Sequence, residues 1–414
     1  MPVSAPAGQG TRPAPVGIDE SHSSGGPELR LSAALGCAGV ATFSLMYAPQ
    51  GLLTRIGTEA AVSPSRAALT VSATTLGLAL SVLPWAWLSD RIGRPGAMRY
   101  AAAAAALTGL LVPWLWTFDL LVAGRFVQGV ALGGIPSLAM ALVHEVAAPG
   151  RAAALAGSYV GATSMGGLAG RVIVVPLAEM IGWRPALAVM GVGVALLMVV
   201  LALLLPRTTG RRAASHSTRS LLAAHLRDPV QLALYGIAGL LIGCMVIVFN
   251  YLPFRLEAAP YHLAPTLISL IFLAYLAGTV GSPVAGRLAD RLGPRVVLVM
   301  ACALVLGGTA LSLARPLAAV LTGVVILTGG MFIGHAVASG AVGIRARAGR
   351  AQATALYTIF YYLGASIFGW AGGLAWAHGH WPAVVAVVAT LAAAALLLVF
   401  VATERRERAE PIGQ

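Results

Sequence analysis

The stretch AWLSDRIGRPG, residues 86–96, separates two long apolar segments and decides how the rest of the chain is interpreted. Further along the chain, GRLADRLGPR at residues 286–295 again lies between two apolar segments. Asp90 and Asp290 occupy equivalent places in the two stretches. The sequence therefore predicts two copies of one architecture.

Each stretch has the features of a helix that ends at a membrane surface and is followed by a tight turn. Gly93 permits the backbone conformation that reverses the chain, and the arginines remain at the headgroup level. Asp90 faces the negative end of its helix dipole, so it needs a neighbouring arginine or a helix N-terminus to hold it. Such a contact can form when two helices close and break when they part, as in a gate. The predicted gate residues are Asp90, Arg91, Gly93, Arg94, Asp290, Arg291, Gly293 and, at the same membrane surface, Glu145.

The composition is that of a membrane protein. Of 414 residues, 58% are hydrophobic and only 10% are charged, far more apolar than a soluble globular protein. The formal charge of +13 comes from arginines in small groups between apolar segments, a pattern that argues against nucleic-acid binding. Cys37, Cys244 and Cys302 lie in different apolar segments. We therefore expect small buried residues there, and neither a disulfide framework nor a metal site.

A membrane-spanning helix needs about 20 mainly apolar residues. By that criterion the sequence predicts twelve spans, at 31–53, 67–88, 98–116, 120–146, 152–178, 185–205, 230–254, 265–285, 296–313, 317–343, 351–376 and 382–402. The polar connections alternate in charge, with twenty arginines on one side of the predicted membrane and five on the other. The positive-inside rule therefore predicts that both termini are cytoplasmic.

The longest polar connection, residues 207–229, is a predicted cytoplasmic linker between two halves of six helices. We expect an all-α membrane protein with bundles at 31–206 and 230–403. Residues 1–30 and 404–414 are expected to be cytoplasmic tails, the first of them disordered because it is rich in proline, glycine, alanine and serine. A parallel repeat of this kind binds substrate near the bilayer midplane, and rocking of the halves exposes it to each side in turn.

The loop DRIGR, which begins at Asp90 and is echoed in the second half, resembles the signature loop of the major facilitator superfamily. Ala86 stands where that family usually has glycine, and Pro95 where it usually has a second basic residue. The segment RFVQG, which begins at Arg125, resembles the family's helix-four motif. The resemblance implies twelve helices in two pseudo-repeats, and proton coupling or substrate contact at Arg125 and Gln128. The alternative is an arginine that reaches toward the interface or fixes helix packing.

The segment that contains Tyr47 and Gln50, at the end of helix one, is similar to the bacterial 12-helix drug:proton antiporters and to related sugar-efflux exporters. The glycine-rich helix five resembles the helix-five motif of superfamily antiporters, which implies export rather than uptake, although Ala162 stands in place of the usual proline. Small residues at this spacing permit close helix approach. We assign that packing role to Gly157, Gly161, Gly166 and Gly167.

Ionisable residues inside a membrane span are costly and are therefore candidate functional residues. Arg125 and Arg171 are the clearest, and together they could attract an anionic substrate. Arg171 could equally pair with Glu179 or Asp119. His335 could carry a proton between pH 5 and 8, with a packing role as its alternative. Asp119, at the mouth of helix four, is a comparable candidate for proton coupling.

We predict a monomeric secondary transporter of the bacterial inner membrane that exports a small organic molecule in exchange for protons. Tyr361 is a candidate substrate contact, with packing between helices as its alternative. Other possible functions are a sugar or organic-anion exporter, a facilitator without ion coupling, and a membrane-embedded enzyme. An enzyme would need convergent catalytic groups, which no predicted span carries. No GxxxxGK[ST] loop for ATP is present, and we expect no cofactor.

Overall fold

The computed structural model describes residues 25–147, 151–207 and 218–407, and these ranges are helical with no strand. The predicted all-α class is therefore confirmed. Helix α1 begins at Gly25, so the last six residues of the tail predicted at 1–30 are helical instead. Residues 1–24 and the tail from 408 onward lie outside the described residues.

The first half of the chain contains α1 (Gly25–Tyr47), η1 (Ala48–Leu52), α2 (Leu53–Glu59), α3 (Pro64–Ile92), α4 (Arg94–Leu111), η2 (Val112–Trp114), α5 (Phe118–Gly133), α6 (Pro136–Val146), α7 (Ala152–Val172), α8 (Val174–Ile181) and α9 (Trp183–Leu204). The second half contains α10 (Thr218–Arg227), α11 (Pro229–Glu257), α12 (Pro265–Ser269), η3 (Leu270–Tyr275), α13 (Leu276–Leu292), α14 (Pro294–Leu311), α15 (Leu317–Arg345) and α16 (Arg350–Glu407). The predicted linker thus contains the short helix α10.

Several spans consist of consecutive helical segments, because proline lacks the backbone donor that a regular helix needs. α1 passes through η1, which contains Pro49, into α2, and α6 begins at Pro136 directly after α5. α16 bends at Gly379 and His380, whose backbone angles are not helical. It therefore makes two passes along the bundle rather than one.

Nine helical stretches of the described chain are long and apolar enough to cross a membrane. The last of them, Arg350–Ala402, covers two predicted spans. The two remaining predicted spans are helical as well, at α4 and at α12 to α13. α4 is less apolar because its sequence is rich in alanine and carries arginine near its start. All twelve predicted spans therefore fall on helices.

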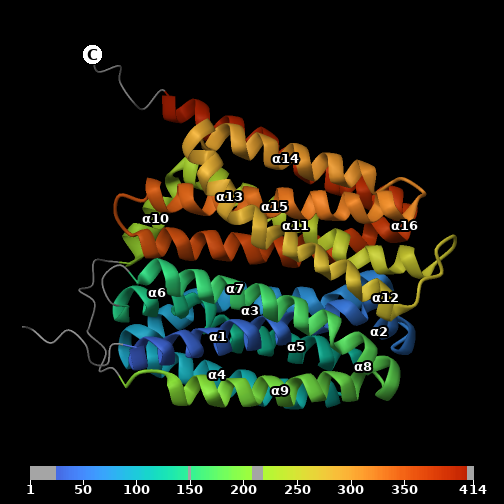
Figure 1. The fold of residues 1–414 in the computed structure, drawn as a ribbon, viewed down its shortest axis with the longest axis horizontal. Coiled ribbons are helices and arrows are strands. Elements are labelled where there is room, and N and C mark those ends of the chain that lie inside the picture. Colours follow the sequence, from blue (N-terminus) through green and yellow to red (C-terminus); the bar gives the residue numbers. More distant parts are fainter. Residues whose placement is uncertain (1–24, 148–150, 208–217, 408–414) are drawn as a thin grey trace, which may run out of the picture.

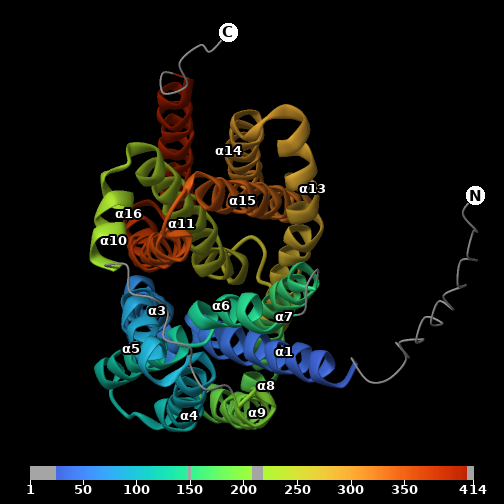
Figure 2. The same ribbon diagram turned by 90° about the vertical axis from the view of Figure 1, so that its left-hand side faces the viewer.

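The helices form two bundles that lie side by side along the molecule (Figure 1 and Figure 2). In the first bundle α1 packs against α7, α3 against α5, and α4 against α9. In the second, α11 packs against α16 and α14 against α15. The bundles meet chiefly where α3 packs against α16 and where α7 meets η3.

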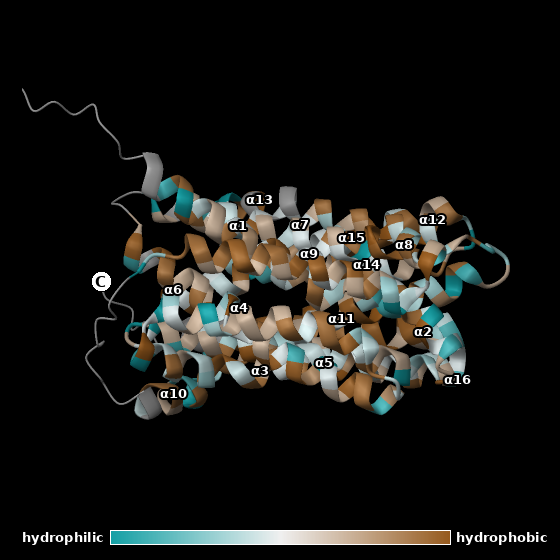
Figure 3. Cartoon of the chain, turned by 90° about the horizontal axis from the view of Figure 1, so that it is seen from below, coloured by the Kyte–Doolittle hydropathy of each residue, from teal (hydrophilic) through white to brown (hydrophobic). Residues whose placement is uncertain are grey.

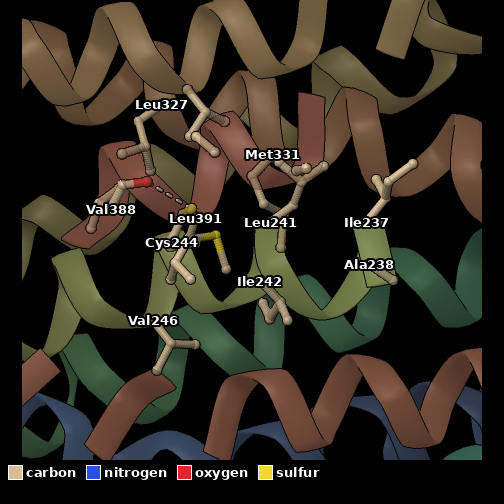
Figure 4. Packing of buried hydrophobic residues seen from close by; sticks show 14 of the residues in the cluster. Ile237, Ala238, Leu241, Ile242, Cys244, Val246, Leu327, Met331, Val388 and Leu391 are labelled. Carbon is tan, nitrogen blue, oxygen red and sulfur yellow. Dashed lines mark hydrogen bonds between the residues drawn. The ribbon is translucent and has the colours of Figure 1, made fainter. Parts of the chain in front are cut away.

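The core of the second bundle surrounds α11 (Figure 4). Ile237, Leu241 and Cys244 of this helix belong to one buried cluster with Leu327 of α15 and Val388 of α16. Cys244 Sγ donates a weak hydrogen bond to Val388 O at 3.5 Å. A second buried cluster lies in the first bundle and is joined by Tyr362 of α16.

Hydrophobic residues cover most of the length of the helices (Figure 3). On α9, Leu196, Val199 and Leu203 are exposed at the surface of the molecule. An extended apolar surface of this kind is stable only when lipid or another apolar partner covers it.

The two repeated stretches have the same backbone geometry. Gly93 ends α3 with φ 79° and ψ 151°, and Gly293 ends α13 with φ 84° and ψ 149°. Only glycine adopts this region readily, so the predicted glycine turns are present. Both turns lie at the end of the molecule that carries α10, which we call the arginine-rich end (Figure 1). The opposite end, near α2 and α12, is called the arginine-poor end.

Candidate functional site

Arg171, in the last turn of α7, is fully buried between the two bundles. Its Nε donates to Gln50 Oε1 at 2.7 Å, its Nη1 to Gly167 O at 2.6 Å, and its Nη2 to Tyr275 Oη at 3.0 Å. Gln50 Nε2 in turn donates to Asn250 Oδ1 at 2.6 Å. This chain of hydrogen bonds joins the first bundle to the second.

Three aromatic rings surround the Arg171 guanidinium. Its Cζ lies 4.0 Å from the ring centroid of Tyr47, 4.5 Å from that of Tyr275 and 5.1 Å from that of Phe272. The ion pairs between described residues do not include Arg171. The buried positive charge is therefore held by neutral amide, carbonyl and hydroxyl groups and by aromatic faces.

The two carboxylates proposed as partners of Arg171 have other contacts. Glu179 accepts hydrogen bonds from Thr266, and Asp119 is exposed and pairs with Arg66 at 2.6 Å. The interpretation of Arg171 as a simple structural ion pair with either residue is therefore wrong. Asp119 also lies away from the buried site, at the arginine-poor surface, so the structure does not bring it to the candidate coupling residues.

Arg125, on α5, is buried within the first bundle. It donates to the backbone carbonyls of Leu45 at 3.1 Å and Met46 at 2.6 Å, to Thr70 O at 2.8 Å, and to the Gln128 side chain. The Leu45 carbonyl is free for this contact because the residue four positions later is Pro49, which has no N–H. Arg125 thus fixes the end of α1 directly before Tyr47, and it does not reach the surface as a snorkelling side chain would.

His335, on α15, lies beside tyrosines of α16. Its Nδ1 is 2.9 Å from Tyr357 Oη, and that hydroxyl also donates to His335 O at 3.1 Å. The His335 ring centroid is 4.8 Å from that of Tyr361, which is 5.1 Å from that of Tyr362. Tyr362 is buried in the core cluster that also contains Tyr47 of the first bundle. Through Tyr361 and Tyr362, the rings beside His335 reach the core cluster of the first bundle.

The hydrogen bonds described between the bundles lie toward the arginine-poor end. Besides the contacts of Arg171 and Gln50, Thr54 Oγ1 donates to Glu257 Oε1 at 2.7 Å and Thr266 Oγ1 to Glu179 Oε2 at 2.6 Å. One further bond joins the bundles, from Ser366 Oγ to the Ser72 carbonyl at 2.8 Å. We call the first set the latch, and it consists of Gln50, Thr54, Arg171, Glu179, Asn250, Glu257, Thr266 and Tyr275.

The family model of the Major Facilitator Superfamily matches residues 31–344 and 258–414 of this chain. This chain belongs to the major facilitator superfamily. Over 372 residues it is 36% identical to YybF, an uncharacterized MFS-type transporter of Bacillus subtilis, covering 89% of this chain and 92% of the relative. Over 373 residues it is 32% identical to the inner membrane transport protein YnfM of Escherichia coli, covering 89% of each.

More distant matches agree with this assignment. A probable sugar efflux transporter of Helicobacter pylori is 24% identical over 248 residues, 58% of this chain and 61% of its own length. Among solved structures, an inward-facing, unoccupied bacterial homolog of the human lysosomal transporter Spinster superposes with a TM-score of 0.76 at 14% identity, covering 93% of this chain and 99% of that one. This major facilitator protein is therefore a membrane-spanning transporter and not an enzyme.

The superfamily's signature loops do not join the bundles in the conformation described. Asp90 is exposed and forms no ion pair with another described residue. Arg94 pairs with Glu145 of α6, as the predicted charge cluster requires, but both belong to the first bundle. Arg91 lies over the Trp87 ring, 3.5 Å from its centroid. The exposed members of the predicted gate are Asp90, Arg91, Glu145, Asp290 and Arg291.

The glycines of α7 differ in their surroundings. A Cβ added at Gly166 would lie 2.4 Å from Val40 O, so only glycine permits this approach of α7 to α1. A Cβ at Gly167 would lie 3.2 Å from Arg171 Nη1. At Gly157 and Gly161 nothing lies within 4 Å. The predicted packing role is therefore wrong for these last two glycines in this conformation, because no neighbouring helix reaches them.

Sequence reasoning missed several latch residues, although one signal was available. Gln50 and Asn250 are separated by 200 residues, the same offset that relates Asp90 to Asp290. They are therefore equivalent positions of the two repeats, and they hydrogen-bond to each other between the bundles. Tyr275 carries no comparable signal, because an aromatic residue in an apolar helix usually packs in the core.

Proposed function

We propose that this transporter exports a small organic molecule across the inner membrane by alternating access, in exchange for protons. The arginine-rich end, where α1 begins and α16 ends, then faces the cytoplasm, because arginines concentrate on cytoplasmic loops. The similarity to an inner membrane transport protein supports the location. The similarity to a probable sugar efflux transporter supports export rather than uptake.

The distribution of contacts between the bundles supports alternating access. Most buried apolar residues of each bundle belong to that bundle's own core cluster, and among the described residues only Ala68 and Tyr362 join the cluster of the opposite bundle. This distribution supports movement of the bundles as two bodies. The latch holds them at the arginine-poor end through a few hydrogen bonds. The neutral bond between Gln50 and Asn250 contributes about 0.5–1.5 kcal/mol net, and the bonds to charged groups about 1.5–3 kcal/mol each. Loss of one or two of these bonds therefore shifts the equilibrium toward opening.

In this proposal the conformation described is closed toward the periplasm. Within the part of the chain that the structure describes, Asp90, Arg91, Arg94 and Asp290 form no ion pair that joins the bundles in this state. These residues would make such contacts when the arginine-rich end closes and the latch opens. A partly desolvated pair that forms in only one state biases the equilibrium between the two states.

His335 and Tyr357 are proposed as the proton site. The Tyr357 hydroxyl can donate to the ring or to the His335 carbonyl, and a protonated ring can donate to the hydroxyl. The pair therefore keeps a hydrogen bond in both protonation states. Arg125 and Gln128 act indirectly, by fixing the backbone that positions Tyr47 and Gln50.

A second candidate is a facilitator without proton coupling. In the described chain the carboxylates nearest the interface, Glu179 and Glu257, lie at the arginine-poor ends of α8 and α11 and not mid-span. A mid-span carboxylate is the usual intramembrane proton carrier. This arrangement favours export driven by the gradient of the substrate or by the membrane potential.

Proteoliposomes that contain a pH-sensitive dye distinguish the two modes. Organic anions, sugars and cationic dyes are offered as substrates, and lumenal pH and substrate content are followed together. The control is His378→Gln, since His378 is an exposed histidine that bonds the Leu374 carbonyl. Exchange is supported if proton movement depends on substrate, is lost in His335→Gln and is retained in His378→Gln. Substrate movement without proton movement identifies the facilitator, and absence of any substrate-dependent flux contradicts the proposed function.

A further inference from the structure

Among the described residues two arginines are buried, Arg125 and Arg171, and their N–H groups have different hydrogen-bond partners. Arg125 makes four hydrogen bonds, three of them to backbone carbonyls of neighbouring helices. Its role in fixing α1 is therefore complete without a ligand. Arg171 makes three bonds, to a side-chain amide, its own helix backbone and a phenol. A guanidinium has five N–H groups, so two at Arg171 lack an acceptor among the described residues.

A buried cation without an anionic partner is costly, because its lost hydration is not repaid by a nearby opposite charge. Such a group persists in a membrane protein chiefly where it serves function. The planar guanidinium fork matches a carboxylate, which would supply both the missing acceptors and the missing negative charge. A neutral sugar would supply acceptors alone, and an organic cation would be repelled.

The surroundings of Arg171 indicate the rest of the ligand. The rings of Tyr47, Phe272 and Tyr275 cover the guanidinium. In the second bundle, the Tyr361 ring centroid lies 4.8 Å from that of His335. These rings present flat apolar faces and few polar atoms, which suit an aromatic or aliphatic body.

We infer that the substrate is an organic anion with a carboxylate on an apolar or aromatic body, and that this carboxylate binds Arg171. The inference rests on the proposed transport function and specifies its substrate class. Because Gln50 and Tyr275 hold Arg171 in the latch, the carboxylate displaces latch contacts when it binds. Substrate arriving from the cytoplasm therefore weakens the closure of the arginine-poor end and promotes its own release there.

The negative charge of the ligand lets the membrane potential drive its export. A potential of 100 mV, negative inside, favours an exported monovalent anion by about 50-fold in concentration. Exchange of the anion for a proton would move two charges per cycle and the facilitator mode one, so the anion site is compatible with both modes. In either mode the inference predicts that transport moves net charge.

The test is binding to the purified full chain in lipid nanodiscs. Three probes share one ring system and differ only in charge: 1-naphthoate, 1-naphthamide and 1-naphthylmethylammonium. We expect saturable binding of the carboxylate, at least about tenfold tighter than that of either other probe. Arg171→Gln should weaken carboxylate binding by about 30-fold or more, and Arg171→Lys by less.

Two further variants separate ligand binding from folding. Arg184→Gln alters an arginine that donates to the Pro113 and Leu115 carbonyls at the arginine-poor end, and its carboxylate affinity should equal that of the wild type. Tyr275→Phe removes a competitor for Arg171 and should tighten carboxylate binding, which a purely structural role of Arg171 does not predict. Equal binding of the amide or ammonium probe, absence of carboxylate binding, or unchanged affinity in Arg171→Gln would overturn the inference.

Flux measurements in proteoliposomes distinguish failure of this inference from failure of the proposed function. Carboxylate binding at Arg171 without substrate flux of any kind supports the anion site and contradicts export. Flux of sugars or cations without carboxylate binding supports transport and overturns the anion site.

Discussion

The substitution Gln50→Leu should open the arginine-poor end of the molecule. In the closed state it leaves Arg171 Nε and Asn250 Oδ1 without the partners that now lie 2.7 Å and 2.6 Å away. A buried unsatisfied neutral group costs about 1–3 kcal/mol and a hydrogen bond to a charged group contributes about 1.5–3 kcal/mol. In the open state water can hydrate both groups, so the cost falls on the closed state alone. A total of about 3–5 kcal/mol shifts the equilibrium toward opening by roughly a hundredfold to several thousandfold.

Pulsed EPR distances in nanodiscs measure this shift. Spin labels are placed at Thr58 and Ala259, which are exposed at the arginine-poor ends of the two bundles, after the three native cysteines have been replaced. The wild type should show a narrow short-distance population and Gln50→Leu a longer one. Gln231→Leu is the matched control, since Gln231 is a buried glutamine of α11 that bonds the Val342 carbonyl within the second bundle. An unchanged distribution in Gln50→Leu, or an equal shift in the control, would refute the reasoning.

Three further predictions concern other parts of the molecule. Gly166→Leu should abolish stable folding, because its Cβ would lie 2.4 Å from an α1 carbonyl oxygen; the measurement is loss of the monodisperse peak in size-exclusion chromatography. Gly157→Leu is the control and should fold, because nothing lies within 4 Å of a Cβ at that position. Equal behaviour of the two variants would contradict this packing. Asp90→Asn should reduce transport, because it removes a charge from the predicted gate. It should not lower the melting temperature, because Asp90 has no ion-pair partner among the described residues in this state. Unchanged flux in reconstituted vesicles would reject the role of Asp90 in the gate. Burial alone would raise the pKa of the Asp228 carboxyl, but the Arg345 guanidinium and backbone N–H groups of α11 lower it overall. The stability that the carboxylate contributes is therefore present above about pH 4 and is lost as pH falls through the lower folded-state pKa. The difference in thermal unfolding between Asp228→Asn and the wild type should therefore be full at pH 6 and shrink steadily as pH falls below about 4, and a constant difference would exclude this linkage.

The helices and the two halves could be predicted from the sequence because the bilayer imposes strong constraints. About 20 apolar residues are needed for each span, and the glycine turns at Gly93 and Gly293 repeat with the same chemistry. The partners of Arg125 were also accessible in principle, since Pro49 leaves the carbonyl of Leu45 without its helical donor. Local sequence therefore determines the backbone of the site well.

The latch was not predictable in the same way. α11 is apolar on nearly all sides and almost completely buried, so hydropathy does not determine which of its faces meets the first bundle. Whether Asn250 points toward Gln50 depends on that rotation, which only packing of both bundles fixes. The positions of Gly157 and Gly161 depend in the same way on how far apart the bundles lie. Small residues there indicate a possible close approach, and the conformation decides whether it occurs.

The most direct test of the account is uptake of a radiolabelled aromatic carboxylate into inside-out vesicles, whose lumen corresponds to the periplasm. The account predicts uptake that depends on the protein, increases when the lumen is made electrically positive with a potassium diffusion potential, and is lost in Arg171→Gln but not in Arg184→Gln. Persistence of uptake after the pH gradient is collapsed identifies the potential as the driving force. Uptake that is equal in vesicles without the protein, or that is unchanged by Arg171→Gln, would contradict the account.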